Sequence, residues 1–341
     1  MSFLLCVACH NDSNQISVPS DLREDIKADK LISAKDAYDI FNSDEKAIFI
    51  QISKEDVFIE KHIPGAHQIW RNQFSSTQSD SITGMIAEVS QLQELLQNLG
   101  YTESHQLLLY DAKANVDAFR FAWILELYGI ENYKVINGGL KFWESSAYPV
   151  TDSPTEQVHK SGFLLKNGID SSSYASMKDI MEAMVDTNTL IVDTREDYEF
   201  KGEPFMKSGQ VFKYKPGAFE RGKIPGSIHL PWSQLSDLTG DHRIKSFKDL
   251  EWDLNAKGIS KEKNIIVYCQ SGARSSHTYF ILKHVMNFEQ VKNYDGSWIE
   301  WSYNHRGNEN QKIEQLCNDN DFETLMVKYQ TEVDSIKNLQ I

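Results

Sequence analysis

One cysteine of this chain stands where local structure can turn a thiol into a nucleophile. Residues 265–276 read Ile-Ile-Val-Tyr-Cys-Gln-Ser-Gly-Ala-Arg-Ser-Ser, an apolar run that stops at Cys269 and then passes through Gly272 into a helical pattern. At the start of a helix, unpaired backbone N–H groups and the positive end of the helix dipole stabilise a thiolate. We therefore predict that Cys269 is a nucleophile.

The polar residues after Cys269 predict a loop that binds an anion. Gly272 lets the backbone curl so that successive N–H groups point inward, and Arg274 adds a fixed positive charge. A cysteine buried only for packing, which is the alternative, has no use for polar surroundings of this kind. The predicted active-site loop consists of Gln270, Ser271, Gly272, Ala273 and Arg274.

A cysteine phosphatase also places a cysteine and an arginine at the start of a helix. Its phosphate loop makes room for a tetrahedral oxyanion and is longer than the four residues that separate Cys269 from Arg274. The shorter loop favours sulfur chemistry over phosphoryl chemistry.

These residues lie in the second of two similar halves. The segment His-Ile-Pro-Gly-Ala at 62–66 returns as Lys-Ile-Pro-Gly-Ser at 223–227, and Leu-Leu-Leu-Tyr-Asp at 107–111 returns as Ile-Ile-Val-Tyr-Cys at 265–269. Because the landmarks follow the same order in both halves, the sequence predicts a duplicated domain.

Each half alternates short apolar β-rich runs with amphipathic helical stretches, the pattern of a mainly parallel sheet with helices on both faces. The fold class is therefore α/β, with two tandem domains. Strands are expected at 47–52, 106–110, 134–136, 189–193, 264–268 and 290–293, and helices at 89–99, 118–128, 247–256 and 275–286.

The expected domain boundaries follow from composition. An N-terminal tail covers residues 1–30, a non-catalytic domain 31–150, a linker rich in Pro, Ser, Thr and charge 151–172, the catalytic domain 173–305, and a C-terminal extension 306–341. The extension has a weak helical pattern over 321–339 and is expected to pack as an appendage.

Composition excludes several classes of function. A net charge of -14 on 341 residues argues against binding of nucleic acid or anionic membrane surfaces. No stretch reaches the ~20 apolar residues that a membrane span requires. The histidines show no ligand spacing with acids or cysteines, so we expect no metal site, and no motif calls for a cofactor.

Four motifs of the second half resemble those of the rhodanese sulfurtransferases. Cys-Gln-Ser-Gly-Ala-Arg at 269–274 is similar to the six-residue active loop of that family, and Gly222–Pro231 resembles its Gly-His-Ile-Pro-Gly-Ala segment. Asp-Thr-Arg at 193–195 and Tyr-Asp-Gly-Ser-Trp-Ile-Glu-Trp at 294–301 match two further motifs in the expected order. The resemblance implies two tandem rhodanese-like domains, of which the first, with Asp111 in place of Cys269, cannot form a persulfide.

The resemblance also implies an activity. Cys269 would attack the outer sulfur of thiosulfate or 3-mercaptopyruvate, become a persulfide, and pass the sulfur to a thiol or cyanide acceptor, with a thioredoxin-like reductant as a further partner. Arg195 would hold the sulfonate or carboxylate of the donor. A pairing of Arg195 with a neighbouring carboxylate is the alternative.

The residues point to two different donors. Ser271 and His62 match a serine and a first-domain histidine of mercaptopyruvate-using members, so that His62 would bind substrate. Gln270 and Arg274 depart from the Cys-Gly-Ser-Gly-Val-Thr loop of those members, and an arginine there is more typical of thiosulfate-type rhodaneses. For His62, a residue of an ordinary turn is the alternative.

A second class of function also fits the sequence. A sulfur-relay or scaffold protein, fed by a partner protein, would receive sulfur on Cys269 without turning over a small donor. The dependence of turnover on the acceptor distinguishes this class from the enzyme.

The N-terminal cysteines allow three interpretations. Cys6 and Cys9 precede His10 in the spacing of c-type haem attachment, but no export signal is present. Residues 5–9 also resemble the end of a bacterial lipoprotein signal, which would anchor the chain in the cell envelope through Cys9 if the true start lies upstream. A frayed terminus with incidental cysteines is the third interpretation, and it accords with a cytoplasmic protein of reduced thiols.

Overall fold

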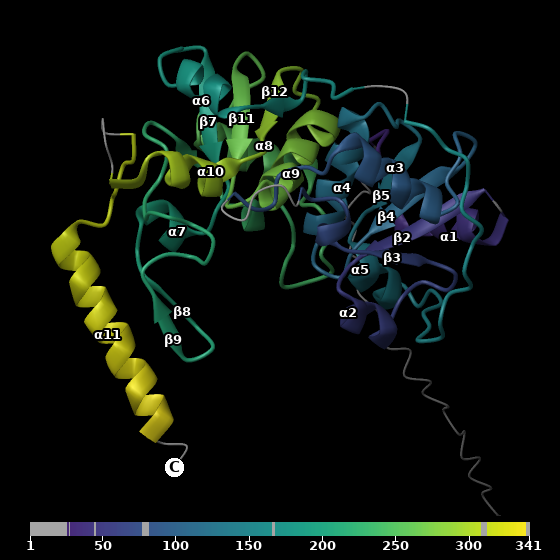
Figure 1. The fold of residues 1–341 in the computed structure, drawn as a ribbon, viewed down its shortest axis with the longest axis horizontal. Coiled ribbons are helices and arrows are strands. Elements are labelled where there is room, and N and C mark those ends of the chain that lie inside the picture. The colour runs from purple at the N-terminus through teal and green to yellow at the C-terminus, as the bar shows by residue number, and fades with distance from the viewer. Residues whose placement is uncertain are drawn as a thin grey trace, which may run out of the picture.

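The computed structural model describes residues 26, 28–43, 46–76, 82–165, 168–307 and 312–338. Two five-stranded parallel sheets account for the two halves of the sequence (Figure 1). The first sheet has the order β1-β5-β4-β2-β3 and the second β10-β7-β11-β12-β6. The predicted α/β fold class is therefore confirmed, with equivalent strands at the centre of both sheets.

The strands lie close to their predicted positions. The first sheet contains β1 (Leu31–Ile32), β2 (Ala47–Ile52), β3 (His67–Ile69), β4 (Gln106–Tyr110) and β5 (Tyr133–Ile136). The second contains β6 (Tyr174–Ala175), β7 (Thr189–Asp193), β10 (Ile228–His229), β11 (Asn264–Tyr268) and β12 (Val291–Tyr294).

Helices cover both faces of each sheet. In the first half these are α1 (Ala34–Ser43), α2 (Glu55–Glu60), α3 (Val89–Asn98), α4 (Val116–Leu127) and α5 (Gly139–Ser145). In the second half they are α6 (Met177–Ala183), α7 (Asp197–Lys201), α8 (Phe247–Ala256), α9 (Ala273–Phe280) and α10 (Ser297–Asn304). Short 3-10 turns occur at Arg71–Gln73 and Trp232–Gln234.

The two faces follow from the alternation of side chains along each strand. In β4, Leu107 and Leu109 join the hydrophobic cluster under α3 and α4, whereas Leu108 and Tyr110 join the cluster under α1, α2 and α5. Successive side chains of a strand point to opposite faces, so an apolar run without polar alternation requires cover on both sides. This is why the strands of both halves read as continuous apolar runs.

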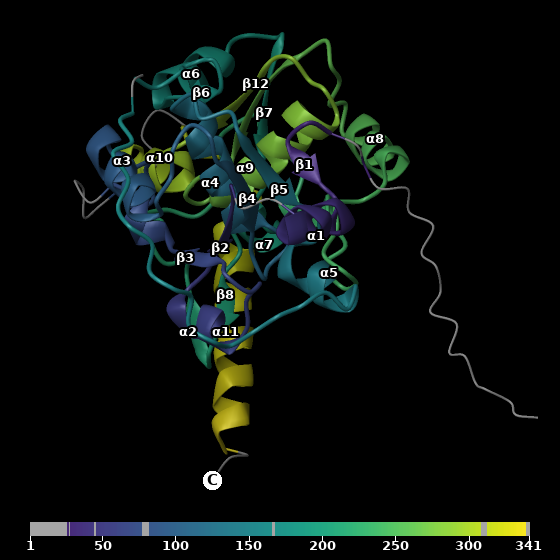
Figure 2. The same ribbon diagram turned by 90° about the vertical axis from the view of Figure 1, so that its right-hand side faces the viewer.

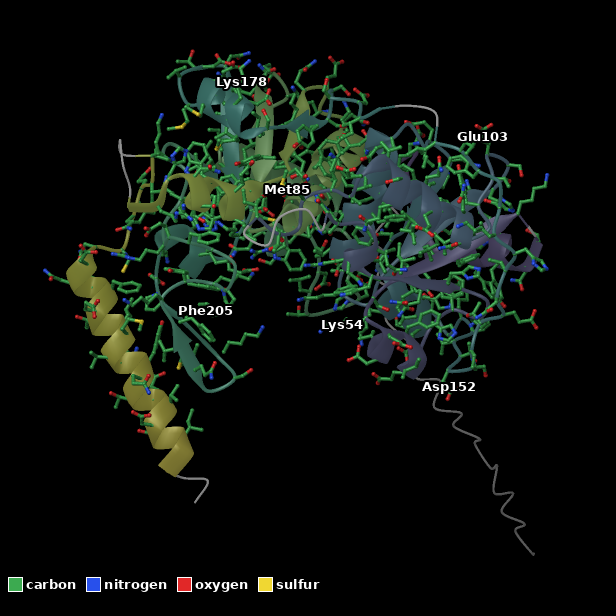
Figure 3. All side chains as sticks on the ribbon, viewed as in Figure 1. Lys54, Met85, Glu103, Asp152, Lys178 and Phe205 are labelled. Atoms are coloured by element: carbon green, nitrogen blue, oxygen red, sulfur yellow. The ribbon has the colours of Figure 1, made fainter. Side chains whose placement is uncertain are left out.

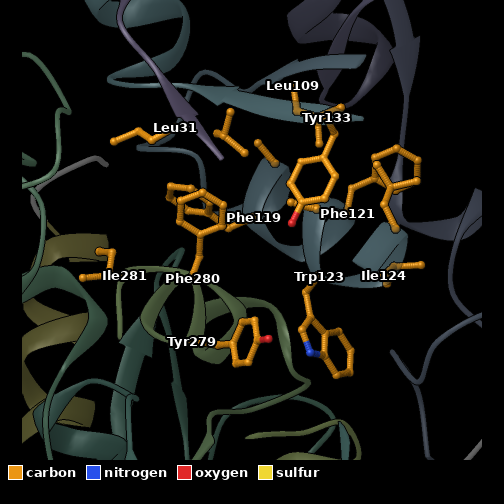
Figure 4. Packing of buried hydrophobic residues seen from close by; sticks show 14 of the residues in the cluster. Leu31, Leu109, Phe119, Phe121, Trp123, Ile124, Tyr133, Tyr279, Phe280 and Ile281 are labelled. Carbon is orange, nitrogen blue, oxygen red and sulfur yellow. The ribbon is translucent and has the colours of Figure 1, made fainter. Parts of the chain in front are cut away.

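The domains meet through α4 and α9, which pack against each other. The rings of Phe119 on α4 and Phe280 on α9 lie 4.3 Å apart between centroids (Figure 4). Both residues belong to one hydrophobic cluster that continues from the first sheet into the second. The interface is therefore an extension of both cores, which fixes the relative position of the domains.

Two features of the second half differ from the sequence-based prediction. The helix predicted over 275–286 begins earlier, at Ala273, and continues after Phe280 as a π-helical turn, Ile281–Val285. An antiparallel hairpin of β8 (Phe205–Lys207) and β9 (Gln210–Phe212) was not predicted. Its turn residues Ser208 and Gly209 both have positive φ, the requirement of a tight two-residue hairpin turn.

The C-terminal extension forms α11 (Asp319–Asn338), close to the predicted helix. It projects from the second domain and lies beside the β8–β9 hairpin in two perpendicular views (Figures 1 and 2). Among the described residues, no helix is both long and apolar enough to cross a membrane.

Candidate active site

Cys269 lies directly after the central strand β11, and α9 begins four residues later. Its side chain is buried, with the residue 1% exposed, yet it lines a cavity of about 830 Å³. Residues of both domains line this cavity, among them Trp70, Lys113 and Arg120 from the first and Lys215 from the second. The candidate nucleophile therefore lies at a cavity between the two domains.

The surroundings of Cys269 favour its thiolate. Burial raises the pKa of the thiol, but the charge of Arg274 and hydrogen bonds from Ser275 and from the backbone of Ser271 outweigh this effect, so the pKa is lowered. The Ser275 hydroxyl is buried and has no other hydrogen-bond partner among the described residues. It is therefore available to donate to a charged sulfur.

A buried carboxylate holds Arg274 in place. The Arg274 Nη1 and Nη2 atoms donate to Glu199 Oε2 and Oε1 at 2.5 and 2.8 Å. Burial disfavours the charged form of Glu199, but Arg274 dominates and lowers the pKa of this carboxyl to about 2. Lys215 lies 3.6 Å from the same carboxylate. The arginine beside the sulfur is thus fixed by a bidentate ion pair.

Residues of the second domain hold the loop of Cys269 in place. Gly272 has a φ of +82°, a left-handed conformation that favours glycine. Its carbonyl oxygen accepts hydrogen bonds from Ser276 Oγ at 2.7 Å and from Asn293 Nδ2 at 3.3 Å. The Cys269 N–H donates to Ser297 Oγ at 3.2 Å. The strand-end motif at 294–297 therefore buttresses the loop.

The first domain supports the loop from the other side. Arg120, on α4, is buried and donates to Asp295 Oδ1 at 2.5 Å and to the Gly84 carbonyl oxygen at 2.8 Å. The Ile86 N–H donates to the second oxygen of Asp295 at 2.9 Å. Arg120 approaches so closely that a Cβ on Gly272 would lie 2.6 Å from its Nη1 atom. A residue of the first domain thus packs directly on the loop of Cys269.

Arg195, which was predicted to hold the donor, does not line the cavity of Cys269. Its guanidinium is buried against Asp193, with Nε at 2.9 Å from Oδ1 and Nη2 at 2.5 Å from Oδ2, and it also donates to the Gly222 carbonyl oxygen at 2.8 Å. The structure shows the alternative, in which Arg195 pairs with a neighbouring carboxylate. Asp193 and Arg195 share a strand end, so this pairing forms locally.

His62 is also remote from the cavity of Cys269. It is 1% exposed, its Nδ1 lies 2.8 Å from the Phe58 carbonyl oxygen, and its ring stacks on the Phe58 ring at 3.8 Å. It lines a different cavity, between α2 and the segment 152–158. The structure therefore brings together Cys269, its loop and Arg274 at one cavity. Arg195 lines a smaller cavity that shares Lys215 and Gln270 with it, and His62 lines a separate cavity.

In the first domain the equivalent loop is filled by its own side chain. The Asp111 carboxylate accepts hydrogen bonds from the backbone N–H groups of Lys113, Asn115, Asp117 and Ala118, at 2.5 to 3.3 Å. Burial and the neighbouring Asp117 raise the pKa of Asp111 to about 6, against the effect of these hydrogen bonds. The loop is an anion cradle without a thiol.

Other expected features lie elsewhere or outside the described residues. No group of metal-ligating side chains occurs among the residues that the structure describes. Cys317, the second described thiol, is buried next to α11 and lines another cavity. Cys6, Cys9 and His10 fall outside the described residues.

Several residues of the site were not predicted from the sequence. Arg120 could have been predicted, because it is the lone cation of α4 and lies within the otherwise apolar run 118–125, where a charge requires a buried partner. Glu199 and Lys215 had none, because only the tertiary fold brings them beside Arg274.

Comparison with known proteins agrees with the fold. Residues 33–146 and 176–304 each match the rhodanese-like domain family. The chain therefore belongs to the rhodanese family, with two such domains in tandem.

Several relatives carry sulfur-transfer names. A putative thiosulfate sulfurtransferase of Mycolicibacterium smegmatis is 31% identical over 260 residues, covering 75% of this chain and 88% of that protein. Sulfur carrier protein TtuD of Thermus thermophilus is 29% identical over 263 residues, covering 76% and 88%. The chain is accordingly a rhodanese-family relative of sulfurtransferases and sulfur carriers.

A solved structure shares the fold. The anaerobic ergothioneine biosynthesis enzyme of Chlorobium limicola, in complex with trimethyl histidine, superimposes with a TM-score of 0.68 at 22% identity, covering 84% of this chain and 70% of that one.

Proposed function

We propose that this protein transfers sulfane sulfur from a small donor to a thiophilic acceptor through a persulfide on Cys269. The observation that carries the proposal is a buried thiol of lowered pKa that lines a cavity rich in cationic side chains. A thiolate is the reactive form of cysteine, and positive charge attracts anionic sulfur donors.

With thiosulfate the first step is a displacement at sulfur. The Cys269 thiolate attacks the outer sulfur, the bond between the two donor sulfurs breaks, and sulfite leaves with the electron pair. The new persulfide carries its charge on the terminal sulfur, where the backbone N–H groups of Ser271 and Ser275 stabilise it as they stabilise the thiolate. A cyanide or thiolate acceptor then attacks this terminal sulfur and restores the Cys269 thiolate.

Among the candidate donors the cavity favours thiosulfate over 3-mercaptopyruvate. Arg274 stands in the loop, and His62 lies outside the cavity, so the residue match that suggested mercaptopyruvate is incomplete. Lys215 lines the cavity on the Cys269 side and is suited to bind the sulfonate group in place of Arg195. The name of the Mycolicibacterium smegmatis relative supports the same donor.

A protein-fed sulfur relay is the second candidate, because the Thermus thermophilus relative is named as a sulfur carrier. Both candidates require a reduced thiol, which accords with the cytoplasmic setting proposed for this chain. A relay would discharge rapidly to one protein thiol, such as a thioredoxin-like partner, and slowly to cyanide.

Intact-mass measurement tests the proposal. Reduced wild-type protein, Cys269→Ser and Cys317→Ser are each incubated with thiosulfate and, separately, with 3-mercaptopyruvate. We expect wild type and Cys317→Ser to gain one sulfur atom, ~32 Da, and Cys269→Ser to gain none. If Cys269→Ser gained sulfur, another cysteine would carry the persulfide. If wild type gained no sulfur from either donor, the small-donor enzyme would be overturned in favour of the relay.

A further inference from the structure

The cavity at Cys269 is larger than a small sulfur donor requires. Its volume of about 830 Å³ falls in the range of pockets that bury most of a drug-sized ligand. Thiosulfate, with only a few atoms, would fill a small part of it beside the sulfur. Most of the cavity therefore remains for a larger molecule that approaches Cys269.

The charge of this cavity is unusual for the chain. Seven cationic side chains line it, and among the lining residues that the structure describes Asp117 is the only acid; they are Lys54, Arg71, Lys113, Arg120, Lys207, Lys215 and Arg274. The chain as a whole carries a net charge of -14. A concentrated positive cavity in an acidic protein attracts anions selectively.

Four of these cations already have carboxylate partners. Arg274 and Lys215 face Glu199, Arg120 binds Asp295, and Arg71 binds Asp117. Their charge is largely balanced within the fold, so they act on structure and on the sulfur more than on the rest of a ligand.

The other three are Lys54, Lys113 and Lys207, which we call the lysine wall. All three side chains are exposed, and none forms a hydrogen bond or ion pair with a described residue. Lys54 precedes α2, Lys113 follows β4, and Lys207 ends β8. In Figure 3, Lys54 faces the hairpin of Phe205 across the space between the domains. The wall thus presents unbalanced charge to the cavity from both domains.

We infer that the lysine wall binds the body of the sulfur acceptor, and that this acceptor is a small thiol bearing two or more further anionic groups. The inference rests on the proposed persulfide at Cys269. The acceptor thiolate attacks the terminal sulfur of the Cys269 persulfide, the bond between the two persulfide sulfurs breaks, and Cys269 leaves as a thiolate. The products are the acceptor persulfide and free enzyme, so no oxidant or reductant is consumed.

A charge series of acceptors tests this inference. Protein loaded with thiosulfate is mixed with 2-mercaptoethanol, 3-mercaptopropionate or mercaptosuccinate, which carry no, one and two carboxylates, and the loss of persulfide is followed by intact mass. The variants are Lys54→Gln, Lys113→Gln, Lys207→Gln and the triple variant. Lys178→Gln is the control, because Lys178 is exposed on α6 and does not line the cavity (Figure 3).

The decisive quantity is the rate with mercaptosuccinate divided by the rate with 2-mercaptoethanol, compared between variants so that the intrinsic reactivity of each thiol cancels. Each single lysine variant should lower this ratio about two- to fivefold, the range of a partly exposed ion pair, and the triple variant should lower it further. Added salt should lower the wild-type ratio in the same way. Lys178→Gln should leave it unchanged.

An unchanged ratio in the triple variant would overturn the inference while the persulfide itself remained established. If the lysine variants instead slowed only the discharge to reduced thioredoxin, the wall would serve a protein and the small-thiol inference would be wrong. Should wild type fail to load, the proposed function fails, and protection of Cys269 against alkylation by succinate becomes the readout. Equal protection in wild type and the triple variant would then contradict the lysine wall as an anion site.

Discussion

Replacing Arg274 by glutamine separates two roles that this residue plays. It stabilises the thiolate of Cys269, and it neutralises Glu199, whose side chain is 2% exposed. Loss of Arg274 therefore has one effect on reactivity and another on stability. Comparison with the double variant Glu199→Gln/Arg274→Gln, which removes the buried carboxylate as well, divides the two effects.

The stability effect follows from the pKa of Glu199. Its pKa falls from 4.5 to about 2 in the folded protein, and a tenfold change in an ionisation constant corresponds to about 1.4 kcal/mol, so the ion pair contributes about 3 kcal/mol. Arg274→Gln should lose roughly this amount at neutral pH, in agreement with the ~3–5 kcal/mol expected for one partner of a broken buried pair. The double variant should regain part of it. Urea denaturation followed by tryptophan fluorescence measures all three proteins.

The pH dependence has a definite sign. Because folding lowers the pKa of Glu199, its contribution is present above pH 4.5 and is lost as the pH falls toward 2. Wild type should therefore lose this contribution over that window, and the double variant should not. A double variant no more stable than Arg274→Gln would refute the view that an unpaired Glu199 causes the loss.

The reactivity effect appears in the titration of the thiol. Loss of the Arg274 charge should raise the pKa of Cys269, because a neighbouring positive charge favours the thiolate. The ultraviolet absorbance of the thiolate, taken as the difference from Cys269→Ser, follows this titration. An unchanged titration in both variants would mean that the loop N–H groups and Ser275 stabilise the thiolate without the arginine.

Three further substitutions test the supports of the loop. Gly272→Ala places a Cβ 2.6 Å from Arg120 Nη1 at a φ of +82° and should slow persulfide formation, with ~1–2 kcal/mol lost to the left-handed conformation alone; intact mass and circular dichroism check both. Arg120→Met leaves Asp295 buried without its cation and should lower the free energy of unfolding by about 3–5 kcal/mol in urea denaturation, whereas Arg120→Lys should recover part of the loss. Arg221→Ala removes two contacts that tie the C-terminal extension to the segment around Arg221, namely the hydrogen bond to the Cys317 carbonyl oxygen and the ion pair with Asp319. We expect KM for thiosulfate to rise about two- to fivefold, or ~0.5–1 kcal/mol, with kcat retained. An unchanged KM would mean that the extension does not influence the site.

The local part of the site could be predicted from the sequence. Cys269, Gly272 and Arg274 lie within six residues at a strand-to-helix turn, so the apolar run and the glycine already fix their geometry. The central strands β2, β4, β7 and β11 were equally readable, because each is an apolar run bounded by polar residues. Interactions between residues that lie close together in the sequence decide these features.

The rest depends on contacts between distant segments. Glu199 reaches Arg274 over 75 residues of chain, and Arg120 reaches Asp295 over 175. Arg195 and His62 each matched a family position, and each side chain contacts a near neighbour, Asp193 or Phe58. Their role in binding a substrate stays a prediction. A motif gives the residue type at a position, but the local hydrogen bonds decide where its side chain points.

The first domain explains why a duplicated chain can retain a copy without a thiol. Its loop keeps the inward-facing N–H groups, and the Asp111 carboxylate accepts hydrogen bonds from them. The same domain supplies Arg120 against Gly272 and two lysines of the lysine wall. In the proposed mechanism the second copy therefore provides the nucleophile Cys269, and the first copy contributes a support for its loop and two cations beside the acceptor.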